Sequence, residues 1–267
     1  MITLNVIIML LLLGAVVGIM AGLLGVGGGG IMVPALTTLF LSQGVAVDEV
    51  VHLALGTSMA AIIITSLSSL RAHHAKGSVR WDIVKTITPG IILGTFAATF
   101  LASHLSSKPL AIFFSAFMAY VSVQMFLNIK PKEHRELPGA AGVLSAGGVI
   151  GGISALVSIG GGSLTVPYLT WCNIPLKNAI GTSAAIGLPI AIAGTIGYLV
   201  NGWSNTSAEH LTIGFIYIPA VLIISLMSFF TAPIGVSLAH RLPVGILKKI
   251  FSVLLIVLSA KMVTSVL

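Results

Sequence analysis

Charged side chains are scarce in this chain of 267 residues: only 7% are Asp, Glu, Lys or Arg, against roughly a quarter in soluble domains. Apolar residues make up 57% of the chain, and its mean hydropathy is +1.12. This balance excludes a soluble globular domain and indicates an integral membrane protein.

Cysteine and early basic residues are also missing. The single Cys172 excludes an internal disulfide, and no Cys/His spacing resembles a metal site. No Lys or Arg precedes Arg71, so the first apolar run lacks the basic flank of a signal peptide and is expected to be a retained span. We expect no metal and no cofactor, and the net charge of +7 is interpreted by its distribution rather than as a sign of nucleic acid.

Long apolar stretches separated by short polar breaks are what the sequence does contain. They lie at about 4–25, 31–42, 50–70, 83–104, 108–128, 139–159, 164–173, 178–200, 211–238 and 244–266. Most can cross a hydrocarbon core about 30 Å thick as a helix. The second and seventh are too short and are predicted to be half-helices. The expected fold class is therefore an all-α integral membrane protein with about eight full spans and two short elements.

The two halves of the chain repeat each other. GVGGGGIMVPAL (25–36) aligns with SIGGGSLTVPYL (158–169), LGTSMA (55–60) with IGTSAA (180–185), and LASHLS (101–106) with LAHRLP (238–243). Three matches in the same order indicate an internal duplication. The predicted organisation is a first membrane repeat at 1–128, a cytoplasmic linker at 129–138 and a second repeat at 139–267.

Five elements per half, an odd number, predict two repeats of opposite orientation, and the basic residues support this. With both termini outside, eleven basic residues lie inside or at the inner interface: Arg71, Lys76, Arg80, Lys85, Lys130, Lys132, Arg135, Lys177, Arg241, Lys248 and Lys249. Only Lys108 and Lys261 lie outside. Many secondary transporters use such inverted repeats for alternating access. Parallel repeats with full crossings are the alternative topology.

The stretch GVGGGG contains the glycine spacing G-x-G-x-x-G of a dinucleotide-binding turn. That turn needs a βαβ unit, which a membrane span cannot supply, and the second copy has serines at the outer positions. The copies share a glycine triple and a proline five residues later, which predicts unwound backbone leading into half-helices that start at Pro34 and Pro167. Such helix starts favour anions. The candidate ligands here are Gly27, Gly28, Gly29, Gly30, Gly160, Gly161, Gly162 and Ser163. Tight helix packing is the alternative role for these glycines, and it is the role expected of Gly14, Gly18 and Gly22 at four-residue spacing.

Two Gly-Thr-Ser motifs follow at equivalent positions. Their hydroxyls, on Thr57, Ser58, Thr182 and Ser183, can donate to a bound oxyanion or bond within the helix bundle. His52 and Lys177 stand four residues before the two Gly-Thr-Ser motifs. They either attract an anion to the two mouths of the transporter or act as interfacial anchors. No acidic residue lies inside a span, and since cation carriers usually need one there, an anionic substrate is favoured.

The glycine turn followed by VPAL or VPYL, the Gly-Thr-Ser motif and the LAHRLP segment resemble the sulfite exporter family of TauE/SafE type, over essentially the whole chain. The resemblance implies a multi-pass transporter of a prokaryotic inner membrane that moves sulfite, sulfonates or related organosulfur anions. Composition and spacing alone suggest only a small anion.

The leading hypothesis is thus a secondary transporter, an exporter of a small anion by alternating access, and not an enzyme. An anion channel with the same site is one alternative. A much weaker one is an intramembrane hydrolase with Ser163 as nucleophile, which needs a histidine within hydrogen-bond reach. The expected partners are a small anion and the lipid bilayer, without nucleic acid, and a homo-oligomer is compatible with the sequence.

Overall fold

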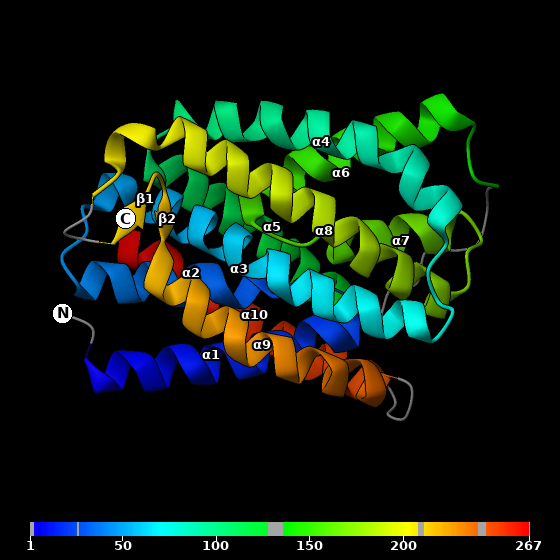
Figure 1. The fold of residues 1–267 in the computed structure, drawn as a ribbon, viewed down its shortest axis with the longest axis horizontal. Helices are drawn as coiled ribbons and strands as arrows, with labels where there is room; N and C mark the ends of the chain where they lie inside the picture. Colours follow the sequence, from blue (N-terminus) through cyan, green and yellow to red (C-terminus); the bar gives the residue numbers. More distant parts are fainter. Residues whose placement is uncertain (1–2, 26, 128–135, 208–210, 240–243, 267) are drawn as a thin grey trace.

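The structure is a computed structural model that describes residues 3–25, 27–127, 136–207, 211–239 and 244–266. In these ranges ten α-helices lie side by side along the long axis of the molecule, and a small hairpin lies at one end (Figure 1). The helices are α1 (Leu4–Leu24), α2 (Gly29–Ser42), α3 (Val47–Ala75), α4 (Trp81–Ser103), α5 (Ser107–Phe126), α6 (Ala140–Val157), α7 (Gly162–Trp171), α8 (Leu176–Asn201), α9 (Ile218–Ala239) and α10 (Val244–Val266). A 3₁₀ turn, η1 (Trp203–Asn205), and the strands β1 (Thr212–Ile213) and β2 (Ile216–Tyr217) complete the described elements.

Eight helices are long and apolar enough to cross a membrane, whereas α2 has 14 residues and α7 has 10. This confirms the predicted class of an all-α membrane protein with eight spans and two short elements. The central spans are α3 and α8, which contact each other and are the most buried, at 83% and 61% of their apolar windows. Both Gly-Thr-Ser motifs therefore lie on the two helices at the core of the bundle.

The expected helix at 211–238 is wrong at its start. Residues 212–217 form the antiparallel hairpin of β1 and β2, and α9 begins only at Ile218. Gly214 adopts a left-handed φ of 56° at the turn, a conformation that glycine adopts without steric cost. Its N–H donates to Thr206 Oγ1 at 2.9 Å, which ties the turn to the preceding loop.

Helices of each half pack on helices of the other half. The first helix of each half packs on the fourth helix of the other half, α1 on α9 and α6 on α4. A methyl group at Gly22 would lie 2.0 Å from the Ala232 carbonyl oxygen, and one at Gly90 would lie 2.0 Å from that of Leu144. The stripe of Gly14, Gly18 and Gly22 thus allows close helix packing, as its four-residue spacing predicts.

Loops from both halves gather at each end of the bundle. The chain ends lie at the same end as the hairpin (Figure 1). At the opposite end the loop before α4 meets the start of α8, where Asn178 Nδ2 donates to the Ser78 carbonyl at 3.4 Å. The predicted linker at 129–138 lies mostly outside the described residues, and so do Lys130, Lys132, Arg135 and Arg241 from the basic-residue count.

Candidate functional site

Both half-helices begin at glycine rather than at proline. The N-cap residues are Gly28 and Gly161, with left-handed φ of 82° and 80°. Because their carbonyls already accept the first helical hydrogen bonds, α2 and α7 start at Gly29 and Gly162.

The prediction that Pro34 and Pro167 start the half-helices is therefore wrong. Each proline lies one and a half turns inside its helix, where its missing N–H removes one helical bond. The N-terminus of each short helix, which favours anions, therefore lies at the glycine triple and not at the proline.

The two glycine turns touch each other in the interior. A methyl group on Gly27 would lie 2.6 Å from the Gly160 nitrogen, and one on Gly160 would lie 3.0 Å from the Gly27 Cα. Ile62 of α3 lies beside both glycines. Gly187 of α8 packs on Gly160, since a methyl group on Gly187 would lie 2.7 Å from the Gly160 carbonyl oxygen. The structure thus brings Gly27 and Gly160 together, and close packing already accounts for these two glycines.

The start of α2 is filled by protein atoms. A methyl group on Gly29 would lie 1.5 Å from the Ser158 carbonyl oxygen, so this oxygen rests directly on the glycine backbone. The methyl position of Gly30 faces the ends of Leu255 and Met118. Apolar side chains and one carbonyl therefore surround this helix start.

The start of α7 differs in that it has two hydroxyl side chains, next to the apolar ends of Ile190 and Ile186. Ser163 aligns with Gly30 and is 9% exposed, and its Oγ has no hydrogen-bond partner in the described part of the chain. Thr165 is fully buried, and its Oγ1 is likewise unpartnered. A methyl group on Gly161 would lie 3.2 Å from Thr165 Oγ1, so this hydroxyl lies against the N-cap residue.

Sequence reasoning missed Thr165. Its signal was a hydroxyl within an apolar half-helix that aligns with Met32 in the first half. The hydrolase alternative gains no support from Ser163, because its Oγ has no histidine partner among the described residues.

The threonines of the Gly-Thr-Ser motifs bind the opposite half. Thr57 Oγ1 accepts a hydrogen bond from the Tyr217 N–H at 2.9 Å, and Thr182 Oγ1 accepts one from the Arg80 N–H at 3.0 Å. Each donor stands one residue before a long helix, α9 or α4. We call these two contacts the hairpin latch (Thr57 with Tyr217) and the loop latch (Thr182 with Arg80).

The glycines of these motifs let the same segments approach. A methyl group on Gly56 would lie 2.1 Å from the Phe215 carbonyl oxygen, and one on Gly181 would lie 2.7 Å from that of Ser78. Beside the loop latch, Asp82 accepts hydrogen bonds from the Arg80 guanidinium and raises its pKa above the ordinary value. The Gly-Thr pairs therefore serve contacts between the halves.

The serines of the motifs differ from each other. Ser183 Oγ donates to the Gly25 carbonyl at 3.3 Å, at the end of α1. Ser58 is fully buried, and its Oγ has no partner in the ranges that the structure describes. Of the four hydroxyls in these two motifs, only that of Ser58 is thus without a hydrogen bond among the described residues.

His52 and Lys177 occupy equivalent positions in very different surroundings. His52 is 4% exposed, its Nε2 donates to the Ala102 carbonyl at 3.0 Å, and its ring lies 5.1 Å from that of Phe215. Lys177 is exposed at the start of α8. His52 is therefore part of the packing beneath the hairpin, whereas Lys177 is free to meet a solute at the opposite end.

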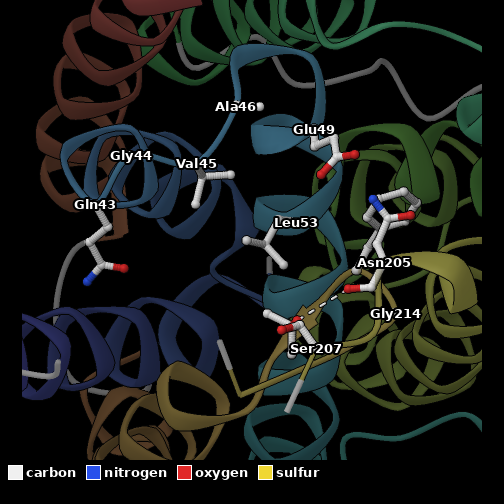
Figure 2. A pocket seen from close by; sticks show the side chains of 11 residues that line it. Gln43, Gly44, Val45, Ala46, Glu49, Leu53, Asn205, Ser207 and Gly214 are labelled. Atoms are coloured by element: carbon white, nitrogen blue, oxygen red, sulfur yellow. Dashed lines mark hydrogen bonds between the residues drawn. The ribbon is translucent and has the colours of Figure 1, made fainter. Parts of the chain in front are cut away.

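A pocket of about 280 Å³ opens at the hairpin end (Figure 2). The loop after α2, with Gln43, and the first turn of α3, with Glu49, line one side. The segment after α8 lines the other side, with Asn205 and Phe215. Glu49 supplies the one charged side chain among the lining residues. A carboxylate here disfavours an anion bound within this pocket.

A bundle of eight spans, with two short helices that start at facing glycine turns, is an architecture of multi-pass membrane transporters. The family model described as sulfite exporter TauE/SafE matches residues 10–262. The chain belongs to this family.

Relatives from distant organisms match most of the chain. A "Probable membrane transporter protein" of Haemophilus influenzae is 38% identical over 96% of this chain and 97% of its own length. Another so named, from Methanocaldococcus jannaschii, is 28% identical over 88% of this chain and 86% of its own, and YdhB of Bacillus subtilis is 29% identical over 73% and 80%. No solved structure matches the chain. Family and relatives together identify a membrane transporter protein.

Proposed function

We propose that the protein is a secondary transporter that exports a small anion, sulfite or an organosulfonate, by alternating access. The observation that carries this is the meeting of two glycine-started half-helices in the bundle, with the buried unpartnered hydroxyls of Ser163 and Thr165 within four residues of the start of one of them. N–H groups in the first turn of a helix have no acceptor within the helix and face the positive end of its dipole, which favours an anion. The name of the family supports a sulfur oxyanion as the cargo.

The two halves act as inverted repeats in this proposal. Support comes from their reciprocal contacts, since each Gly-Thr pair holds the segment before a long helix of the other half. We assign Thr57 and Thr182 to the gates rather than to the ligand, because their oxygens already accept backbone N–H groups. With both latches closed, the site is occluded, and transport requires the latches to open in turn.

The loop latch faces the cytoplasm in this account, and both termini lie outside. The excess of basic residues at that end supports this orientation. The usual inside-negative potential then favours anion exit by about 2.3 kcal/mol per charge per 100 mV. A prokaryotic inner membrane provides this potential, so that export needs no further coupling.

Counterflow tests the proposal. Liposomes that contain the purified protein are loaded with unlabelled sulfite, and radiolabelled sulfite is added outside at a trace concentration. A carrier accumulates labelled sulfite inside the liposomes transiently, because the exit of unlabelled sulfite speeds the return of the binding site to the outer face. An anion channel gives uptake without this overshoot. If sulfite, methanesulfonate and thiosulfate all fail to enter the liposomes, the proposed role in anion transport is contradicted.

A further inference from the structure

We propose that only one of the two glycine turns binds the anion: it lies on the α7 start, held by the hydroxyls of Ser163 and Thr165 with the first-turn N–H groups. This inference rests on the proposed anion transport. It specifies which half of the molecule binds the anion, and it assigns a binding residue, Thr165, that the repeat pattern does not reveal.

The buried, unpartnered Thr165 hydroxyl beside the N-cap of α7 is the first support. Threonines in the helices of this protein commonly donate to the carbonyl four residues back: Thr38 to Pro34 at 2.9 Å, Thr170 to Val166 at 2.9 Å and Thr195 to Ala191 at 2.6 Å. Thr165 has no such bond, although it is fully buried. Its carbonyl four residues back, that of Gly161, already accepts the N–H groups of Leu164 and Thr165. A buried hydroxyl without a partner is unfavourable, and a bound anion supplies the missing acceptor.

The second support is the contrast with α2. In the first half the positions aligned with Ser163 and Thr165 are Gly30 and Met32, which have no hydroxyl. The Ser158 carbonyl oxygen rests on Gly29 and already places negative charge density at that helix start. The α2 start therefore lies against a backbone carbonyl, whereas the start of α7 has two hydroxyl donors, those of Ser163 and Thr165, that have no partner among the described residues.

The chemistry of these groups defines the class of ligand. Two hydroxyls and the N–H groups of Gly162 and Ser163 are uncharged donors in one helical turn. Several donors of this kind suit an anion with two or three oxygens better than a halide, which offers a single centre. We therefore infer preference for an oxyanion over chloride at the α7 turn.

Isosteric substitution tests this assignment in the full-length protein in lipid nanodiscs. Thr165→Val removes the hydroxyl and keeps the shape, and Thr170→Val is the matched control on the same helix, since the Thr170 hydroxyl is bonded within the helix. Met32→Leu is the control in the first half. Sodium sulfite is titrated against each variant, with sodium chloride as the competing anion, and binding is followed by the melting temperature.

We expect Thr165→Val to bind sulfite at least about tenfold more weakly, while Thr170→Val and Met32→Leu stay within about twofold of the parent. Without sulfite, Thr165→Val should melt no lower than the parent, because it removes an unpartnered buried hydroxyl. Should this variant fail to fold, Thr165→Ser and Thr165→Ala form a second pair that differs only in the hydroxyl, and the serine variant should bind more tightly.

Equal binding by Thr165→Val and Thr170→Val, or by the serine and alanine variants, overturns the inference and leaves the anion transporter intact. A parent protein that binds none of sulfite, methanesulfonate and thiosulfate overturns the proposed function itself.

Discussion

The α1–α2 turn and the α6–α7 turn share a left-handed N-cap glycine and a short helix after it, but their surroundings differ. Gly29 lies against a backbone carbonyl and Gly30 against apolar side chains, whereas α7 presents Ser163 and Thr165. Both copies pack the halves together, since Gly27 and Gly160 lie against each other. In the proposed account only the α6–α7 copy also binds the ligand.

The largest effect is expected where the first turn packs most tightly. Gly29→Ala places a methyl group 1.5 Å from the Ser158 carbonyl oxygen, which neither backbone can yield easily. We predict a loss of about 3 kcal/mol of stability or more, seen as little folded protein after extraction in detergent. Gly139→Ala is the control, because nothing lies within 4 Å of its methyl position. A Gly29→Ala protein that melts like the parent would contradict the packing role.

Exchange of the hydroxyl between the two turns sharpens the comparison. Ser163→Ala should weaken sulfite binding about tenfold with little change in stability, because an uncharged donor to an anion is lost. Gly30→Ser adds the equivalent hydroxyl to the first turn, where the flexible ends of Leu255 and Met118 must give way. It should change the Kd of sulfite, measured by titration, by less than about twofold. Tighter binding by Gly30→Ser would mean that both turns hold the anion.

The two latches should open independently. Thr57→Val removes the acceptor of the Tyr217 N–H, and Thr182→Val removes that of the Arg80 N–H. Each change should speed exchange of its own backbone hydrogen about fivefold and leave the other latch unchanged, since one hydrogen bond contributes about 1 kcal/mol. Hydrogen exchange followed by mass spectrometry measures both in one sample. Parallel changes at both ends in either variant would contradict two separate gates.

The smallest effect is expected at the hairpin-end pocket. Glu49 is exposed there, and its charge weakly repels an approaching anion. Glu49→Gln should raise the initial rate of sulfite uptake at low salt by less than about fivefold, and the gain should vanish at high salt because the charge is screened. A gain that persists at high salt would place Glu49 at the binding site rather than on the approach.

The sequence predicted the elements that follow from length and periodicity. Eight spans, two short helices and the packing stripe of Gly14, Gly18 and Gly22 are confirmed, because each depends only on local pattern and on the thickness of a membrane. The repeated motif also drew attention to the glycine turns, which the structure brings into contact.

Other features depended on contacts that the sequence does not contain. Pro34 suggested a helix start, but α2 begins at Gly29, five residues before the proline. Gly28 adopts a left-handed conformation there, and its carbonyl accepts the first helical hydrogen bonds. His52 and Lys177 align, yet only His52 is covered, because Phe215 of the unexpected hairpin packs on its ring. Thr165 was overlooked because it matches Met32 rather than another hydroxyl, so that a search for repeated residues passes over the very position where the halves differ.

A structure with bound selenite, whose selenium can be located by anomalous scattering, tests the central claim most directly. The account predicts one selenium site per chain, at the α7 start within hydrogen-bond distance of Ser163 Oγ and Thr165 Oγ1. Selenium at the α2 start beside Gly30, or in the pocket beside Glu49 with none at α7, would contradict it.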